Sequence, residues 1–203
     1  MTKSGSLLQP NVIQTMNKFA EERHIALVAY TSDDRIVCSQ TNEHTDKIIP
    51  FNEPVPEAIG DAGMAVLGKA GELGVYKMML MGDEEVLRST RGLLELRLES
   101  LASVTKAMDE MLEILPLGAS KWTGVATALD LLGFGPSDCL VMGDGENDLE
   151  MLSRVAEAGG VAVAVGNAVP SLKQAATHVM QEDHDRGAAA AAIRRFALAS
   201  RVA

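Results

Sequence analysis

Two apolar runs separated by a helix-length segment constrain the fold of this chain more than any other feature. The runs are CLVMGDG at 139–145 and GVAVAVGNA at 160–168, and each ends in a polar turn that contains glycine. Strands that are apolar throughout are typical of parallel sheets covered by helices on both faces. The segment at 147–159 has helical spacing, so the three segments together predict a parallel βαβ unit.

The alternation of strands and helices continues on either side of this unit. The sequence predicts helices at 120–133, 171–178 and 186–200, and a short strand at 179–182. Glycine is common just after the last residue of a helix, and Gly133 stands at the end of the first of these segments. The residues from Pro116 onward therefore predict a parallel α/β sheet.

The earlier part of the chain has a different pattern. It predicts one helix at 9–24 and another at 83–100, with β-prone runs at 25–31, 35–39, 74–82, 103–108 and 111–116. The first two runs and the last two are separated by short polar turns, which is typical of antiparallel hairpins. We expect an α+β domain over 1–115 and a parallel α/β domain over 116–203.

Composition excludes several classes of partner. The formal net charge of −10 over 203 residues argues against a nucleic-acid backbone or an anionic membrane as the main partner. No apolar run reaches the roughly 18 residues that a membrane span requires, and the first residues do not resemble a signal peptide. Cys38 and Cys139 lack metal-site spacing and fit the free thiols of a reducing compartment. We expect a cytoplasmic protein that binds a small ligand.

Oxygen-bearing side chains gather directly after the first apolar run. The stretch VMGDGENDLEML contains Asp144, Glu146, Asn147 and Asp148. Open parallel sheets bind ligands at the carboxyl ends of their strands, which is where this turn and the GNA turn are expected. Asp144 and Asp148 could bind a hard cation, usually Mg²⁺ when phosphate is the other ligand. Alternatively, Asp144 is a turn residue and Asp148 caps the next helix.

Lys121 is the candidate phosphate ligand. It begins the helix that precedes the GDGEND strand, so a βαβ arrangement would bring its ammonium group to the same edge. The alternative is a solvated surface lysine. Other nucleotide and metal motifs fail: Leu149 stands where an EF-hand requires glycine, no GxxxxGK[ST] occurs, and the GNA turn has one glycine where a dinucleotide fingerprint needs three.

Four segments in order carry a family resemblance. They are GASKWTGVATALDLLG, VMGDGENDLEML, GVAVAVGNAVPSLKQAATHV and DRGAAAAAIRRF. Together they resemble the C-terminal half of the Cof-type phosphatases of the haloacid dehalogenase-like (HAD) superfamily. The first 112 residues are similar, more loosely, to the α/β cap that covers the active site in that subfamily and selects substrate. The resemblance implies a partial HAD-like Rossmannoid parallel sheet with an α+β cap.

The resemblance also implies an activity and a set of site residues. The family hydrolyses small phosphate monoesters, sugar phosphates by default, with Mg²⁺ and an aspartyl-phosphate intermediate. Lys121 matches the family's phosphate-binding lysine and Asn147 its neighbour in the site. Asp144 matches the metal-binding acid, and Asp148 matches the second acid, which holds metal-bound water or the lysine. Asn167, in the GNA turn, is a weaker match.

One family motif is absent. The nucleophile of the family is the first Asp of a DxDGT motif on the first core strand, and no such motif occurs in this chain. The one DxD, Asp183-His184-Asp185, precedes the last predicted helix and predicts a turn and helix cap. Glu146 is at a variable position in the family and is expected to be a solvated turn residue. Without a nucleophile the covalent step is lost, while binding of phosphate and Mg²⁺ is retained.

Three hypotheses are left open. The chain is part of a Cof-type phosphatase whose DxDGT lies upstream of Met1. Alternatively, it is a binding protein that holds Mg²⁺ and a small phosphorylated ligand without turnover, or that associates with a partner through the open edge of strand 139–145. A redox or nucleotide-binding α/β protein has only the fold class in its favour.

The substrate is expected to be selected in the cap. The segment 40–60 contains Asn42, His44, Lys47 and Asn52 and has no clear period. It is the candidate specificity region, and a solvated loop is the alternative.

Overall fold

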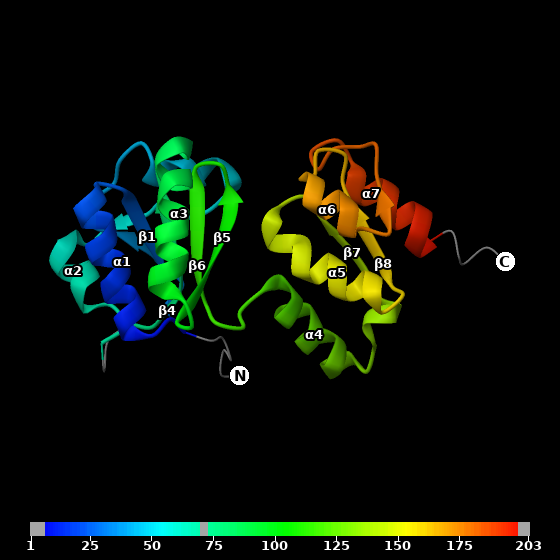
Figure 1. Ribbon diagram of the computed structural model, residues 1–203, viewed down its shortest axis with the longest axis horizontal. Coiled ribbons are helices and arrows are strands. Elements are labelled where there is room, and N and C mark those ends of the chain that lie inside the picture. The colour runs from blue at the N-terminus through cyan, green and yellow to red at the C-terminus, as the bar shows by residue number, and fades with distance from the viewer. Residues whose placement is uncertain (1–6, 70–72, 199–203) are drawn as a thin grey trace. The chain divides into compact units, whose positions relative to one another are not determined.

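The structure is a computed structural model that describes residues 7–69 and 73–198. It divides into two compact units, residues 1–119 and 120–203 (Figure 1). The division falls between Ala119 and Ser120, close to the boundary predicted at Pro116. Each unit has its own hydrophobic core, and each is described separately below.

The first unit is built on a six-stranded sheet in the order β3-β2-β1-β4-β6-β5. The strands are β1 (Ala26–Thr31), β2 (Ile36–Cys38), β3 (Glu57–Ala58), β4 (Val75–Met81), β5 (Ala102–Met108) and β6 (Met111–Pro116). All neighbouring pairs are antiparallel except β2 and β3. The two hairpins predicted from the sequence, β1 with β2 and β5 with β6, are confirmed.

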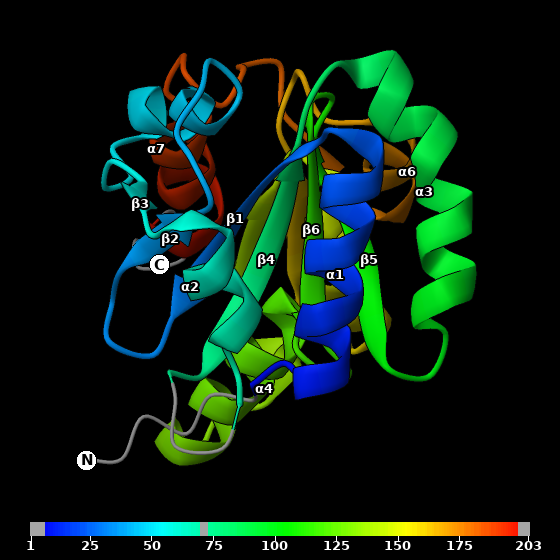
Figure 2. The ribbon, with the colours of Figure 1, turned by 90° about the vertical axis from the view of Figure 1, so that its left-hand side faces the viewer.

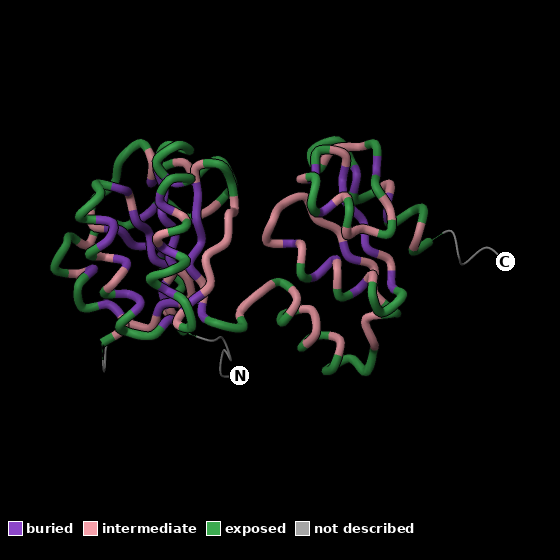
Figure 3. The backbone as a smooth tube through the Cα atoms, in the orientation of Figure 1, coloured by how far each residue is buried: buried purple, intermediate pink, exposed green. Residues whose placement is uncertain are grey.

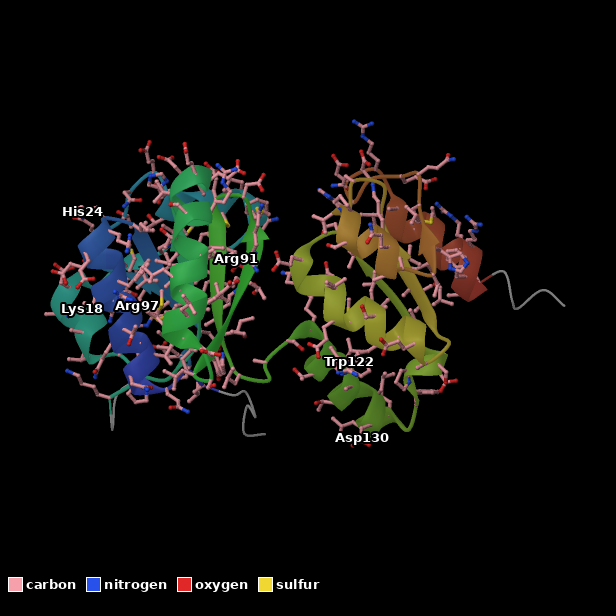
Figure 4. All side chains as sticks on the ribbon, viewed as in Figure 1. Lys18, His24, Arg91, Arg97, Trp122 and Asp130 are labelled. Carbon is pink, nitrogen blue, oxygen red and sulfur yellow. The ribbon has the colours of Figure 1, made fainter. Side chains whose placement is uncertain are left out.

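Helices α1 (Pro10–Arg23), α2 (Gly60–Val66) and α3 (Glu84–Leu98) contribute to one core on the same face of this sheet (Figure 2). The apolar positions that predicted α1 are all buried; they are Val12, Ile13, Met16, Phe19 and Ala20. The helix ends where His24, labelled in Figure 4, adopts a left-handed conformation with φ of 54°. The periodicity of the sequence therefore identified the face of α1 that packs on the sheet.

Residues 40–60 contain structure that the sequence did not predict. A 3-10 helix, η1 (Thr45–Phe51), contains Pro50 and buries Ile48. Its start is held by the side chain of Asn42, whose Oδ1 accepts hydrogen bonds from the backbone N–H groups of His44 and Thr45. Helix α2 buries one residue, Met64. These elements were missed because short helices with so few buried residues leave no periodic signal.

The second unit contains a parallel sheet in the order β7-β8-β9, formed by β7 (Leu140–Gly143), β8 (Val161–Ala164) and β9 (His178–Val179). Its helices are α4 (Lys121–Leu132), α5 (Leu149–Glu157), α6 (Pro170–Ala175) and α7 (Ala188–Ala192), with short turns η2 (Pro136–Asp138) and η3 (Glu146–Asp148) and a π-helical segment η4 (Ile193–Leu198). The predicted parallel α/β sheet is confirmed. The last two residues of the predicted closing helix, 199–200, lie outside the described residues.

Helix α4 has no buried residue, as Figure 3 shows by the absence of purple along it. Trp122, labelled in Figure 4, packs partly against the core of the second unit. At the other end, Leu131 is 80% exposed and Leu132 is 69% exposed. Within the described part of the second unit, β7 is an edge strand that pairs with β8 on one side. The unit therefore presents both an apolar helix face and a strand edge.

None of the described helices is long and apolar enough to span a membrane.

Candidate metal and phosphate site

Loops at the carboxyl ends of β7, β8 and β9 are joined by backbone hydrogen bonds. The N–H of Val169 donates to the carbonyl of Asp144 at 2.9 Å, and the N–H of Gly166 donates to the carbonyl of Glu182 at 2.7 Å. The strands are parallel, so their carboxyl ends meet at one edge of the sheet. The GDGEND turn, the GNA turn and the loop 181–186 consequently form one continuous surface.

Helix α4 delivers Lys121 to this surface. The helix begins with reciprocal hydrogen bonds between Ser120 and Thr123: each side-chain oxygen accepts from the backbone N–H of the other residue. Lys121 is the first helical residue, and its Nζ lies 2.6 Å from Oδ1 of Asp148 and 3.4 Å from Oδ1 of Asn147. The structure thus brings together three of the residues identified in the sequence.

Asp148 is almost completely buried, at 2% exposure. Its Oδ1 accepts from Lys121, and its Oδ2 accepts from the backbone N–H groups of Asp144 at 3.1 Å and Gly145 at 3.2 Å. The carboxylate makes no N-cap hydrogen bond to α5, but its bond to the N–H of Gly145 is the capping contact at the start of the turn η3, which runs directly into α5. The two oxygens of Asp148 thus hold the site loop, the helix start and the lysine, which compensates for the burial of its charge.

Gly143 is required by the position of Asp148. A Cβ atom added at Gly143 would lie 2.5 Å from Cβ and Cγ of Asp148, much closer than two carbon atoms approach without a bond. Gly143 does not have a positive φ. Close approach of Asp148, and not a left-handed backbone, is therefore the reason that glycine is needed here.

Asp144 is the carboxylate that faces solvent. Its side chain is 48% exposed, and its Oδ2 lies 3.3 Å from Nδ1 of His184. No group of three or more His, Cys, Asp or Glu side chains within 7–69 and 73–198 is arranged to hold a metal. One half-exposed carboxylate, near a lysine that could hold phosphate, nevertheless fits Mg²⁺, which commonly takes one or two carboxylates and completes its shell with water and phosphate oxygens.

His184 is the site neighbour that the sequence missed. It belongs to the only DxD of the chain, which was interpreted as a turn and helix cap. The turn is present, with the N–H of Arg186 donating to the carbonyl of Asp183 at 3.0 Å. No side chain caps α7, whose first residue follows Gly187. The sequence signal that could have placed His184 near the site was the position of its loop directly after β9, at the same sheet edge as the GDGEND turn.

Asn167 contacts His184 rather than the lysine. Its Oδ1 accepts from the backbone N–H of His184 at 3.0 Å, and its Nδ2 lies 2.6 Å from Nδ1 of the same residue. Nδ1 of His184 therefore lies next to both Asn167 and Asp144, and it can form a hydrogen bond with only one of them at a time. The candidate site consists of two linked groups, one around Asp148 and one around Asp144.

Other polar sites are less suited to phosphate. A cavity of about 510 Å³ in the first unit includes Asn42, one of the predicted specificity residues, and acidic residues Glu21 and Asp61, but no Lys or Arg among the described residues that line it. Lys47 is ion-paired with Glu110 at 2.6 Å. Phosphate binding needs cations or unpaired N–H groups. The cavity and the paired Lys47 are therefore less suitable phosphate sites than the sheet edge of the second unit.

Cys139 does not replace the missing nucleophile. It precedes β7, whereas the candidate site follows the other end of that strand. Burial raises the pKa of the Cys139 thiol, which keeps the thiol protonated and unreactive at neutral pH.

Comparisons with known proteins agree with this geometry. A family model described as haloacid dehalogenase-like hydrolase matches residues 4–193. The chain is 32% identical over 181 residues to the chloroplastic endoribonuclease YBEY of Arabidopsis thaliana, covering 88% of this chain and 29% of that protein. Thus it spans less than a third of the length of this curated relative.

Solved structures share the fold. A haloacid dehalogenase-like hydrolase from Bacteroides thetaiotaomicron matches with a TM-score of 0.73 and 25% identity, over 93% of this chain and 67% of that one. The HAD subclass IIB sugar phosphatase BT4131 matches with a TM-score of 0.74 and 20% identity, over 95% of this chain and 68% of that one. About a third of each of those chains therefore has no counterpart here.

Proposed function

The chain belongs to the haloacid dehalogenase-like hydrolase family, and we propose that it forms the cap and the metal- and phosphate-binding half of a Mg²⁺-dependent phosphatase of small phosphate monoesters. The first unit is the cap, and the second is the C-terminal half of the catalytic core. The observation that carries the proposal is the Lys121–Asp148 pair at 2.6 Å beside the exposed carboxylate of Asp144. A cation and a free acid at the carboxyl edge of a parallel sheet are complementary to a phosphate and its metal ion.

Each residue has a role that follows from its surroundings. Lys121 is 49% exposed at its side chain, so its ammonium group can bind a phosphate oxygen while Asp148 fixes its position. Asn147 offers its amide next to the same ammonium group. Asp144 is the metal ligand, and Mg²⁺ bound there supplies charge stabilisation for phosphoryl transfer. Because both oxygens of Asp148 are engaged, we assign it to holding Lys121 and the loop.

The aspartate nucleophile comes from a segment outside this chain. No DxDGT occurs among the 203 residues, and about a third of each matched solved structure has no counterpart in this chain. The free edge of β7 and the exposed apolar face of α4 support docking of a nucleophile-bearing strand and its helix on this side of the sheet. This arrangement would bring the nucleophile next to Asp144.

Small phosphorylated metabolites are the proposed substrates, with sugar phosphates first. The fold shared with a sugar phosphatase supports this class. The curated relative is named as an endoribonuclease, but this chain matches 29% of the length of that protein. A formal charge of −10 also opposes the binding of an RNA backbone. A cytoplasmic setting is supported by two cysteines that form no disulfide, Cys38 and Cys139.

Phosphate release tests the proposal. The 203-residue chain and the chain extended by its upstream coding sequence are assayed with a panel of sugar phosphates, with Mg²⁺ and with EDTA. We expect turnover by the extended protein in Mg²⁺ alone, and its loss in the extended protein with Asp144→Asn. Turnover that survives Asp144→Asn or EDTA would refute the proposed role of the metal. Mg²⁺-dependent phosphate binding without turnover in both forms would instead support a binding protein.

A further inference from the structure

The first unit contains a cavity that the proposed function does not use. Its volume is about 510 Å³, and small-molecule sites usually occupy roughly 300–1,000 Å³. It lies between α1 and α2, which are side by side in Figure 2, next to the start of β1. We propose that this cavity binds a primary amine that has an aliphatic body. The inference goes beyond the proposed function and does not depend on it.

One side of α1 faces the cavity. The residues that line it from this helix are Asn17, Ala20, Glu21 and His24. Their spacing of three and four residues places them on one side of the helix. Arg23 does not line the cavity, and its guanidinium carbon lies 4.7 Å from the ring centroid of Phe19. The basic residue next to His24 is therefore on a different side of α1.

Hydrogen bonds join the walls of the cavity before any ligand binds. Nδ2 of Asn17 donates to the carbonyl of Met64 at 2.7 Å, which joins α1 to α2. The N–H of Gly60 donates to the carbonyl of Ser39 at 3.0 Å, and the hydroxyl of Ser39 donates to Oδ1 of Asp61. These bonds tie the start of α2 to the end of β2. A preformed cavity loses little conformational entropy when a ligand binds.

The buried part of the cavity lining is apolar. Ala20, Ile25, Leu27 and Met64 line it and are all buried. No Phe, Tyr or Trp is among the described residues that line the cavity, so it lacks the aromatic cage that usually holds a quaternary ammonium group. This lining fits an aliphatic body and does not favour a quaternary cation.

Two carboxylates without a cationic partner give the cavity its charge. Glu21 and Asp61 are exposed at its rim, and neither forms an ion pair within residues 7–69 and 73–198. Oδ1 of Asn17 accepts no hydrogen bond within the same ranges, and no Lys or Arg of those ranges lines the cavity. An ammonium group has three N–H donors and no acceptor. It is therefore complementary to this rim, whereas an anionic ligand would be repelled.

Binding of cyclohexylammonium to the 203-residue chain tests the proposal. Three compounds with the same body serve as comparison probes: cyclohexanol, cyclohexanecarboxylate and cyclohexyltrimethylammonium. The shifts of alanine and methionine methyl groups in NMR spectra locate the site, because Ala20 and Met64 line the cavity. The titrations are made at pH 8, where histidine is ordinarily neutral and a primary amine is charged. We expect cyclohexylammonium to shift these two methyl groups and to bind at least roughly threefold more tightly than each comparison probe.

Substitution of the two rim carboxylates tests their role. Glu21→Gln should weaken cyclohexylammonium binding roughly threefold, and its combination with Asp61→Asn roughly tenfold, as for exposed ion pairs. Glu22→Gln is the matched control. Glu22 is the next residue of α1, pairs with Lys18 at 3.7 Å and does not line the cavity. This control removes the same charge and should leave the dissociation constant within about 1.5-fold.

Each outcome decides one part of the proposal. If none of the probes shifts the methyl groups of Ala20 and Met64, the cavity is not a ligand site and the proposal is overturned. Equal binding of cyclohexanol would overturn the role of charge, and equal binding of the trimethylammonium probe would overturn the role of the three N–H donors. Equal effects of Glu21→Gln and Glu22→Gln would show general attraction of cations to an acidic chain. Because Asp61 also holds Ser39, Glu21→Gln alone decides if the double variant has a lower melting temperature.

Discussion

At the scale of single residues, the geometry of the candidate site depends on one buried carboxylate. Asp148 accepts hydrogen bonds from Lys121, Asp144 and Gly145, so it fixes both the lysine and the loop that carries the candidate metal ligand. A buried charge is tolerated when it is paired and hydrogen-bonded in this way, and becomes costly when a partner is removed. Substitutions around Asp148 should therefore affect the stability of the second unit as well as ligand binding.

We predict that Gly143→Ala destabilises the chain by about 1–3 kcal/mol, the usual cost of forcing an extra methyl group into a packed site. The added Cβ would lie 2.5 Å from Asp148 and would displace its carboxylate from Lys121. The measurement is urea unfolding. Gly124→Ala is the control, since a Cβ at this position in α4 meets nothing within 4 Å. It should stabilise the helix by about 0.5–1 kcal/mol. Equal effects of the two substitutions would refute the close-contact argument.

A second residue-scale prediction concerns alkaline pH. Burial, and then the nearby charges of Glu53 and Glu113, raise the pKa of Tyr30 above its usual range. A raised folded-state pKa stabilises the fold below the unfolded value of about 10, and this contribution is lost as the pH rises through that value towards the folded pKa. Between about pH 9 and pH 11, the melting temperature should therefore fall less in Tyr30→Phe than in the unaltered chain.

The other tyrosine of the chain, Tyr76, provides the control for this effect. Tyr76→Phe should retain the alkaline loss of the unaltered chain. A Tyr30→Phe variant with the same pH profile as the unaltered chain would show that Tyr30 ionises as readily in the folded state as in the unfolded state.

At the scale of elements, α4 is helical by sequence but unpaired on its apolar side. The capping hydrogen bonds of Ser120 and Thr123 and the left-handed Gly133 define its ends, so local sequence determines where it begins and stops. Its apolar residues Leu131 and Leu132 are exposed. Trp122 packs partly against the core of the second unit, whereas Leu131 and Leu132 lack the packing that normally stabilises an amphipathic helix, and this exposed part is the physical basis for the proposed docking of another segment.

We predict that this face causes self-association of the 203-residue chain. Leu132→Gln should lower the weight-average mass in sedimentation experiments at high concentration without lowering the melting temperature, because the side chain is 69% exposed. Leu96→Gln on α3 is the control. Leu96 is 73% exposed but lies on a helix whose other face is packed on its own sheet. Association that both substitutions reduce equally would point to nonspecific hydrophobic contact.

At the scale of the whole molecule, much of the fold followed from periodicity and turn chemistry. The apolar spacing of α1, the hairpin turns of the first unit and the apolar strands β7 and β8 were each readable locally. Helix α2 and the 3-10 helix η1 were not, because they bury few side chains and are held by tertiary contacts such as the hydrogen bond from Asn17 Nδ2 to the carbonyl of Met64 at 2.7 Å. Local patterns do not encode such contacts.

Prediction of the candidate site from the sequence was limited in the same way. Lys121, Asn147 and Asp148 were identified in the sequence, and the structure brings them together. The contact of His184 with Asp144 was missed, because it joins loops 40 residues apart that meet when β7, β8 and β9 align, and the position of the His184 loop after β9 was its one signal in the sequence. The orientation of Asp148 towards backbone N–H groups was also invisible, since the sequence offered a helix cap as an equally simple use of that residue.

The central claim is that Asp144 and Lys121 form a site for a divalent cation and a phosphate. A crystal of the chain grown with Mn²⁺ and inorganic phosphate tests it directly through anomalous scattering from the manganese. We predict an anomalous peak at coordination distance, roughly 2.0–2.3 Å for a hard cation and oxygen, from the carboxylate of Asp144, with phosphate in contact with Nζ of Lys121. A crystal saturated with both ions that has no peak at Asp144, or that binds phosphate away from Lys121, would contradict the account.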